Sequence, residues 1–400
     1  MTVLVASNVA DAGLKALREA GHTVEKDAAL AGDALAGALA EKRPAVLVVR
    51  STRVTGTMMD ADPSLELIVR AGAGYDTIDV DGASERGIFV ANCPGQNADA
   101  VAELTMGLVV ALDRRLPDNV IDARAGRWNK AAYADADGLK GKTFGIVGLG
   151  NIGEAVAERA KGFEMNGVAW SRSLTKEGAA ARGLAHADSP EAVARFSDIV
   201  SVHVASTPET KHLADRAFFE EMSDGAFFVN TSRAAVVDED ALQWALDEKH
   251  LRAALDLVSD EPSEKETSGF EHPLMQHPRC YVTHHIGAST QQAQDATALE
   301  AARVIETFAE TGQVPNVVNL AAPSEGAHQL TVRHRDKVGV LAGVLDEARK
   351  AGWNIQEMEN LIFAGAGAAV AHIRFDGDPS DETVRDIERH DDVLAVSLLP

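Results

Sequence analysis

The stretch that most constrains the fold is a glycine-rich turn between an apolar run and a helical pattern. Residues 144–147 read Phe-Gly-Ile-Val and are followed by Gly148-x-Gly150-x-x-Gly153 and a helix-favouring run. The first glycine permits a tight turn, the second lets the backbone approach a pyrophosphate, and the third lets the helix pack against the strand. The N–H groups that open the helix would face the phosphates. The sequence therefore predicts a dinucleotide-binding βαβ unit, the alternative being an ordinary strand–turn–helix.

Apolar strands alternate with helical segments on both sides of this turn. The rhythm is βαβ, which predicts parallel sheets covered by helices on both faces. Residues 98–120 read as one long, mostly apolar helix, which we expect in a core or a subunit interface. Four hundred residues exceed one ordinary core, so two or three domains are expected. The expected strands are 3–6, 45–49, 67–70, 88–91, 144–147, 167–170, 199–204, 227–230, 253–257 and 280–283.

The pattern changes near residue 320. Residues 321–327 contain Pro, Ser and Gly and read as a linker. Beyond it the expected order is βαββαβ, which is the ferredoxin-like arrangement. The expected segments are strand 330–333, helix 338–351, strands 355–363 and 368–375, helix 380–389 and strand 393–399.

The charge balance restricts the class of partner. Lys and Arg number 38 and Asp and Glu number 61, which gives a net charge of −23. Such a chain is a poor candidate for binding nucleic acid or an anionic membrane, and an anionic substrate would need local Arg or Lys. The two cysteines fit a reducing compartment. We find neither a secretion signal nor a membrane-spanning run, and we expect a cytoplasmic protein.

Polar clusters follow three of the expected strands, at the edge where open α/β sheets bind ligands. They contain Arg233, Glu261 and the pair His284-His285. An arginine can hold a carboxylate through two donors, a histidine can exchange a hydroxyl proton, and a carboxylate can orient the imidazole. A dinucleotide would supply the hydride. Together these groups predict hydride transfer on a 2-hydroxy acid, whereas each residue by itself could be an ordinary surface or loop side chain.

With these motifs in place, the chain resembles the D-isomer-specific 2-hydroxyacid dehydrogenases. Within that family it is similar to the branch that acts on D-3-phosphoglycerate and carries a C-terminal ACT domain. The resemblance covers essentially the whole chain. Its markers are Arg70–Asp76, Asn92–Pro94, Asn97, Val101–Glu103, Gly148–Gly153, His203-Val204, Thr207–Thr210, Asn230–Arg233, Asp256, Glu261-Pro262 and His285–Thr290.

The resemblance implies roles for individual residues. His285 would be the catalytic histidine because it directly precedes Ile-Gly, although His284 stands where the family usually has proline. Glu261 would orient His285, and Arg233 would bind the substrate. The implied substrate contacts are Arg50, Ser51, Ala73, Gly74, Arg233 and His285. The implied cofactor contacts are Gly148, Gly150, Asn151, Ile152 and Gly153 near the pyrophosphate, Asp256 at the nicotinamide carboxamide, and Ser171, Arg172, His203, Thr207, Thr231 and Gly287. No metal site is predicted.

One departure concerns the cofactor. An acidic residue that binds the adenosine ribose is expected roughly 20 residues after the glycines. This chain instead has Ser171 and Arg172, with no acid before Glu177. Hydroxyl and guanidinium groups would accept a 2′-phosphate, so NADP is expected to be used as well as NAD. Alternatively, Arg172 could lie along the adenine, which would serve NAD equally well.

The resemblance also implies how the chain is divided into domains. Residues 1–95 and 287–318 would form a discontinuous substrate-binding domain, 96–286 a nucleotide-binding Rossmann domain, 319–328 a linker and 329–400 an ACT-like domain. The implied effector contacts are His334, Asp336 and Asn354, although Val338 replaces the usual proline of such modules. L-Serine or another amino acid would bind there, or the module would be purely structural.

The implied reaction is NAD(P)-dependent oxidation of D-3-phosphoglycerate to 3-phosphooxypyruvate by a homodimer or homotetramer. One alternative is a hydroxypyruvate or glyoxylate reductase. The other is a dinucleotide-sensing regulatory protein without turnover, against which the presence of Arg233, Glu261 and His285 argues.

Overall fold

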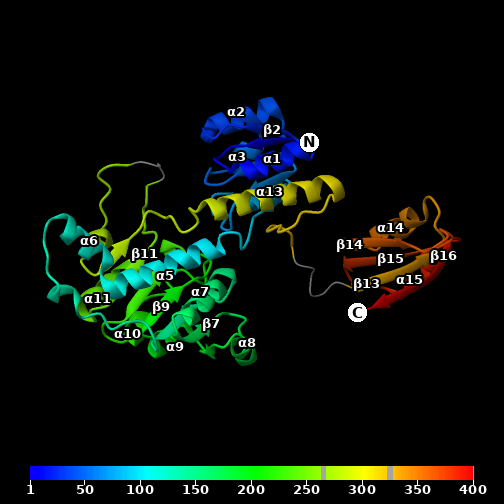
Figure 1. Ribbon diagram of the computed structural model, residues 1–400. Coiled ribbons are helices and arrows are strands. Elements are labelled where there is room, and N and C mark those ends of the chain that lie inside the picture. The colour runs from blue at the N-terminus through cyan, green and yellow to red at the C-terminus, as the bar shows by residue number, and fades with distance from the viewer. Residues whose placement is uncertain (263–266, 322–327, 400) are drawn as a thin grey trace. The chain divides into compact units, whose positions relative to one another are not determined.

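The computed structural model describes residues 1–262, 267–321 and 328–399, and the chain divides into two compact units (Figure 1). The first unit is Met1–Asn319 and the second is Leu320–Pro400. In the described parts of the chain, no helix combines the length and the apolar character needed to cross a membrane.

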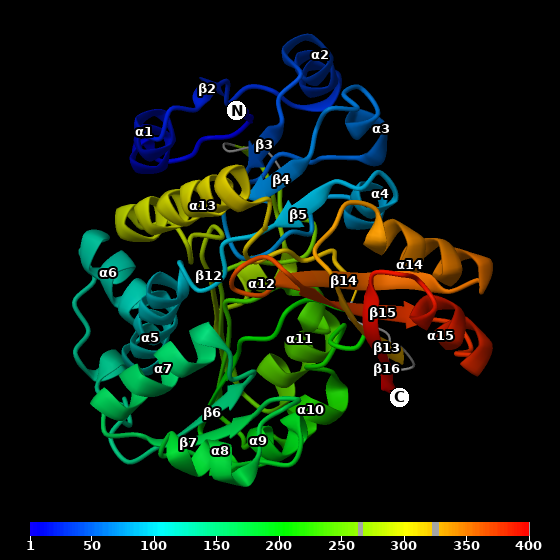
Figure 2. The same ribbon diagram turned by 90° about the vertical axis from the view of Figure 1, so that its right-hand side faces the viewer.

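The first unit begins with a five-stranded parallel sheet in the order β2-β1-β3-β4-β5. Helices α1 and α13 pack on one face and α2, α3 and α4 on the other, as Figure 2 shows. A Cβ atom added at Gly13 would lie 2.2 Å from the carbonyl oxygen of Ala298, so a glycine lets α1 and α13 cross closely. The elements are β1 Thr2–Val5, α1 Asp11–Glu19, β2 Thr23–Lys26, α2 Gly32–Lys42, β3 Val46–Val49, α3 Gly56–Met59, β4 Leu67–Arg70, α4 Val80–Glu85, β5 Phe89–Ala91 and α13 Gln291–Thr311.

The same unit contains a seven-stranded parallel sheet in the order β12-β11-β10-β9-β6-β7-β8. The strand order reverses between β6 and β9, and such a switch point is where open α/β sheets form a ligand crevice. Its elements are α5 Ala98–Arg114, α6 Leu116–Arg124, β6 Thr143–Val147, α7 Asn151–Gly162, β7 Asn166–Trp170, α8 Lys176–Ala181, β8 Ala185–His186, α9 Pro190–Phe196, β9 Ile199–Val202, α10 Arg216–Glu221, β10 Phe227–Asn230, α11 Glu239–Glu248, β11 Arg252–Leu255, α12 Pro273–Gln276 and β12 Cys280–Val282.

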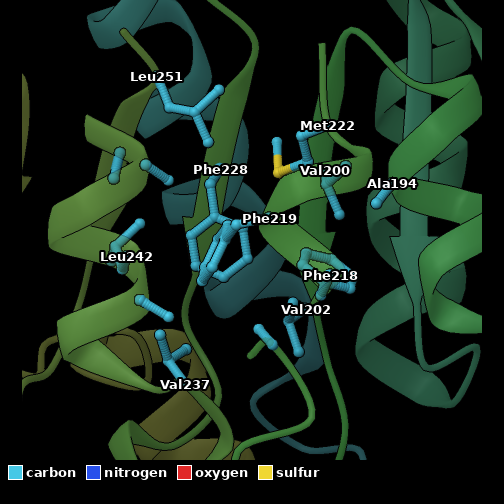
Figure 3. Close-up of a cluster of buried hydrophobic side chains, with 14 of the residues drawn as sticks. Ala194, Val200, Val202, Phe218, Phe219, Met222, Phe228, Val237, Leu242 and Leu251 are labelled. Atoms are coloured by element: carbon cyan, nitrogen blue, oxygen red, sulfur yellow. The ribbon is translucent and has the colours of Figure 1, made fainter. Parts of the chain in front are cut away.

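Each face of this sheet is covered by its own apolar cluster. On one face, residues of α9, α10 and α11 cover the strands, and the rings of Phe218, Phe219 and Phe228 meet edge to face (Figure 3). On the other face, α5 and α7 pack over Phe144 and Ile146 of β6. The predicted two-sided covering of parallel sheets is therefore confirmed.

One predicted element is wrong in its extent. Residues 98–120 do not form a single helix, because α5 ends at Arg114 and α6 begins at Leu116. Arg115 between them has φ +46°, in the left-handed region. Pro117 supplies the reason, since a proline inside a helix lacks an N–H donor and clashes with the preceding turn. The sequence reading also overlooked the short edge strand β2, whose residues are mostly half-exposed or exposed.

The second unit is a four-stranded antiparallel sheet in the order β14-β15-β13-β16. Side chains of α14 and α15 pack against its strands, and Trp353 stacks on Phe375 with 4.0 Å between ring centroids. The predicted βαββαβ order is confirmed, whereas the predicted linker falls mainly on residues outside the described ones. The elements are β13 His328–His334, α14 Val340–Lys350, β14 Asn354–Ile362, β15 Ala369–Asp376, α15 Asp381–Glu388 and β16 Val393–Leu399.

Candidate active site

The three glycines of the turn after β6 have different local surroundings. Gly148 has φ +98°, and a Cβ atom there would lie 2.7 Å from the carbonyl oxygen of His203. A Cβ atom at Gly153 would lie 2.2 Å from the carbonyl oxygen of Gly148. At Gly150, by contrast, no described atom lies within 4 Å of the added carbon. The first and third glycines are thus needed by the fold, and the second leaves open space at the start of α7, as a phosphate cradle requires.

A pocket of about 1320 Å³ lies in the first unit at the carboxyl ends of strands from both parallel sheets. It is large enough for a dinucleotide together with a small substrate. Predicted residues that line it are Arg50, Ser51, Ala73, Gly74, Ile152, His203, Thr207, Thr231, Arg233, Asp256, Glu261, His285 and Gly287. Predicted residues outside this lining are Gly148, Gly150, Asn151, Gly153, Ser171 and Arg172, which follow β6 and β7.

The imidazole and the carboxylate predicted to act together do lie together. Nδ1 of His285 is 2.7 Å from Oε1 of Glu261. A carboxylate at Nδ1 favours the tautomer that carries a proton there, which leaves Nε2 to exchange a proton. His285 comes from the loop after β12 and Glu261 from the loop after β11, two neighbouring parallel strands. His284 also lines the pocket.

Arg233 joins the two sheets at this pocket. Its Nε donates to Oδ2 of Asp76 at 3.2 Å, and its Nη1 donates to the carbonyl oxygen of Ser232 at 2.8 Å. A Cβ atom at Gly74 would lie 2.0 Å from Nη2 of Arg233, so a side chain there would displace the guanidinium from its place over this loop. The loop after β4 and the loop after β10 therefore form one surface.

Sequence reasoning missed Arg70, although it belongs to the quoted motif Arg70–Asp76. Arg70 lines the pocket, and its buried Nε finds no hydrogen-bond partner among the described residues. Burial lowers the pKa of its guanidinium to about 10, and the nearby charges of Arg233 and Arg50 add to the effect. An arginine at the end of an otherwise buried strand was the signal that could have identified it. Arg53, three residues after Arg50, does not line the pocket.

Two further predicted residues, His203 and Asp256, lie in the pocket lining, the first partly and the second fully buried. Burial lowers the pKa of His203 to about 3, so this imidazole is neutral. Its Nε2 lies 2.9 Å from the Ser201 hydroxyl, while its Nδ1 has no partner in the described parts of the chain. An orphaned ring nitrogen in the lining, with the open space at Gly150, fits a bound dinucleotide. Asp256 is 1% exposed, and its carboxylate already accepts three hydrogen bonds from residues 283–287.

Ser171 and Arg172 follow β7, as predicted, at the position expected for ribose recognition. The pKa of the Glu209 carboxyl lies below its ordinary value, first because of hydrogen bonding with the side chain of Thr207 and, as a smaller effect, because of the Arg172 charge. Arg172 is therefore near the Thr207–Glu209 segment. The preference between NAD and NADP stays a prediction.

In the second unit, the predicted effector residues have unequal surroundings. His334 is buried, with Nδ1 2.8 Å from the carbonyl oxygen of Arg335 and Nε2 3.1 Å from Oδ1 of Asn360. Both ring nitrogens are thus engaged within the unit, whereas Asp336 and Asn354 are exposed. Effector binding stays a prediction, and Asp336 and Asn354 are the more accessible contacts.

Comparison with known proteins adds independent evidence. Residues 106–287 match the model of the NAD binding domain of the D-isomer specific 2-hydroxyacid dehydrogenases. The chain is 36% identical over 320 residues to D-3-phosphoglycerate dehydrogenase of Methanocaldococcus jannaschii, covering 80% of this chain and 59% of that protein. It is 36% identical over 282 residues to glyoxylate reductase of Thermococcus litoralis, covering 69% of this chain and 83% of that protein. It thus spans about three fifths of the phosphoglycerate dehydrogenase.

Solved structures agree with these relatives. The TT0316 protein of Thermus thermophilus superposes with a TM-score of 0.69 at 34% identity, covering 80% of this chain and 100% of that one. NAD⁺-bound 3-phosphoglycerate dehydrogenase of Entamoeba histolytica superposes with a TM-score of 0.66 at 27% identity, covering 80% of this chain and 99% of that one. With the fold, the glycine turn and the paired His285 and Glu261 in place, this chain belongs to the D-isomer specific 2-hydroxyacid dehydrogenases, and residues 106–287 carry the family's NAD binding domain.

Proposed function

We propose that this protein oxidises D-3-phosphoglycerate to 3-phosphooxypyruvate with NAD or NADP. The observation that carries the proposal is the gathering of Arg50, Arg70 and Arg233 in the lining of one pocket of a chain whose net charge is −23. Arg233 and Arg50 both lie close enough to Arg70 for their charges to lower its pKa. Such mutual repulsion is unfavourable unless an anion neutralises it. A substrate with a carboxylate at one end and a phosphate at the other matches that demand.

The reaction removes a hydride from C2 of the substrate and a proton from its C2 hydroxyl. Arg233 binds the carboxylate and polarises the C2 oxygen through its guanidinium donors. Nε2 of His285 accepts the proton, and Glu261 at Nδ1 stabilises the resulting imidazolium. When bound, NAD(P)⁺ would supply the hydride acceptor. Arg50 and Arg70 bind the phosphate end, with Nη1 of Arg50 held 3.4 Å from Oε1 of Gln294.

The second candidate is a reductase of hydroxypyruvate or glyoxylate. It is favoured by the similarity to the Thermococcus glyoxylate reductase, of which the chain covers 83%. Neither hydroxypyruvate nor glyoxylate carries a phosphate, so Arg50 and Arg70 would have no substrate phosphate to bind. The test is to compare kcat/KM for 3-phosphoglycerate, hydroxypyruvate and glyoxylate in wild type and Arg50→Ala. A selective loss on the phosphorylated substrate supports our proposal, and equal losses on all substrates refute it.

We propose further that the protein is a homodimer or homotetramer. In the described structure no residue of α6 is buried, and the apolar side chains of Leu116, Val120 and Ile121 are exposed. Trp128, just beyond, is 81% exposed. Clustered exposed apolar residues on a folded protein are typical of an interface. Ile121→Asp should lower the mass measured by light scattering, and an unchanged mass would place the interface elsewhere.

For the second unit we propose an amino-acid effector site, with L-serine as the first ligand to test. The support is the βαββαβ fold of residues 328–399 and the exposed Asp336 and Asn354. Titration of the full chain with L-serine, followed calorimetrically, tests it. Absence of heat from L-serine and a panel of other amino acids would leave the structural role.

A further inference from the structure

The loop that carries His285 has an unusual backbone. His285 has φ +50°, in the left-handed region that residues with a Cβ atom seldom adopt. Histidine is among the side chains that tolerate this region best, but the conformation persists only where the surroundings hold it. The question is therefore which group holds this loop.

The hydrogen bonds of the loop converge on one residue, Asp256. Its carbonyl oxygen accepts the N–H of His285 at 2.6 Å. Its carboxylate accepts the N–H of Ile286 at Oδ1, at 2.9 Å, and the N–H of Gly287 at Oδ2, at 2.7 Å. The hydroxyl of Thr283 also donates to Oδ1, at 2.6 Å. Three successive backbone N–H groups thus bond to one aspartate, the first to its carbonyl oxygen and the next two to its carboxylate.

The packing around the carboxylate is equally specific. Asp256 is 1% exposed, so bulk water barely reaches its oxygens. A Cβ atom at Gly287 would lie 3.0 Å from Oδ2 and 3.4 Å from Cγ2 of Val101, so a side chain there would press on the carboxylate. A carboxylate has about four acceptor positions, of which three are used within the protein. At most one remains for the nicotinamide carboxamide that the sequence led us to expect.

We propose that Asp256 is a positioning residue that holds His285 in register with Glu261; this rests on the proposed dehydrogenase function. The 2.7 Å contact between Nδ1 of His285 and Oε1 of Glu261 requires a particular direction of the imidazole. That direction follows from the left-handed backbone at His285, which the three N–H bonds to Asp256 maintain. Asp256 therefore acts on proton transfer through His285, and its main effect is on kcat.

The first variant is Asp256→Asn, which keeps the shape but replaces one acceptor oxygen with an N–H donor. We expect kcat to fall about 10- to 100-fold, within the range of general acid–base contributions. We expect the dissociation constant for NADH, from fluorescence titration, to change less than about threefold. The pH dependence of kcat should shift, because His285 is no longer held against Glu261. If NADH affinity falls by the same factor as kcat/KM, Asp256 is a carboxamide contact and the proposal is wrong.

Two further variants test whether the effect passes through His285. Asp256→Asn placed in a His285→Ala background should add little, because the residue that it positions is already gone. A full additional loss in the double variant would overturn the proposal. Thr283→Val removes one donor to Oδ1 and leaves the aspartate in place, so it serves if Asp256→Asn does not fold. It should lower kcat severalfold with unchanged NADH affinity.

The matched control is Asp62→Asn. Asp62 is also 1% exposed, and its Oδ1 accepts the N–H of Ser64 at 2.9 Å and the Ser64 hydroxyl at 2.6 Å, away from the pocket lining. It should lower the melting temperature and leave kcat and its pH profile as in wild type. The same kinetic loss in Asp62→Asn would mean that the effect of Asp256 is general destabilisation.

Amide hydrogen exchange tests, without turnover, whether Asp256 holds the loop of residues 285–287. The amides of residues 285–287 should be protected in wild type and exchange at least about tenfold faster in Asp256→Asn. Unchanged exchange overturns the positioning role. Failure of wild type to oxidise any hydroxy acid, while the amides of residues 285–287 stay protected, would instead refute the proposed function. The hold of Asp256 on the loop would then still stand.

Discussion

Replacing Arg70 with methionine should make the ligand-free protein more stable and its substrate binding weaker. The pKa of Arg70 falls from its ordinary value to about 10, chiefly through burial and then through the charges of Arg233 and Arg50. At about 1.4 kcal/mol for each pKa unit, holding the guanidinium charged in the folded state costs about 3 kcal/mol. Because Arg70 is only partly buried, solvent in the pocket reduces this to about 1–3 kcal/mol. The buried, unpaired Nε adds to the cost in the same direction.

The direction of the effect on stability at each pH follows from the difference between the folded and unfolded pKa values of Arg70. The folded pKa lies below the unfolded one, so the charged guanidinium opposes folding at any pH below about 10. The penalty decreases as the pH rises through 10 and Arg70 loses its proton. At pH 7 the full penalty is present, and Arg70→Met should raise the melting temperature by roughly 2–8 °C. The difference from wild type should shrink above about pH 10.

The assay is differential scanning calorimetry in a buffer without phosphate, with steady-state kinetics in parallel. Arg70→Lys is the matched control, because it keeps the charge and should bring little gain in stability. Arg70→Met should also raise KM for 3-phosphoglycerate at least about tenfold, since a hydrogen bond to a charged group contributes about 1.5–3 kcal/mol. A melting temperature at or below that of wild type in Arg70→Met, with Arg70→Lys unchanged, would refute the reasoning and make Arg70 a stabilising residue.

Three other outcomes are expected. His285→Ala should lower kcat by about 10² to 10⁴ with NADH still bound, whereas His284→Ala should stay within about threefold of wild type in the same steady-state assay. Arg172→Ala should lower the NADP-to-NAD ratio of kcat/KM about tenfold, and Ser171→Asp should lower it further, because a carboxylate repels the 2′-phosphate. A chain ending at Asn319 should fold and turn over, because the contacts divide the chain there, and L-serine should inhibit only the full chain.

Each of these has a result that contradicts it. An inactive His284→Ala beside a near-normal His285→Ala would reverse the assignment of the proton acceptor. A strong wild-type preference for NAD that Arg172→Ala leaves unchanged would show that Arg172 does not contact the phosphate. Equal inhibition of full and shortened chains by L-serine would place the effector site in the first unit.

Much of the architecture was accessible from the sequence, because it depends on residues near one another in the chain. Gly148 and Gly153 were assigned to a tight turn and to helix packing, and both are positions where an added Cβ atom would collide with backbone. The βαβ rhythm and the later βαββαβ order follow from apolar periodicity, and both are confirmed. The break between α5 and α6 was missed although its cause, Pro117, is local.

The relations between distant residues were decided by the tertiary structure alone. Arg70 ends β4 and Arg50 follows the neighbouring strand β3, whereas Arg233 follows β10 of the other sheet. The effect of Arg233 on the pKa of Arg70 therefore depends on how the two sheets face each other within the first unit. The role of Asp256 was hidden for the same reason, because its partners lie about thirty residues away on the adjacent strand end. Sequence pattern identifies which side chains can do chemistry. Which of them share one pocket depends on strand order and packing, because these bring residues far apart in the chain within reach of one another.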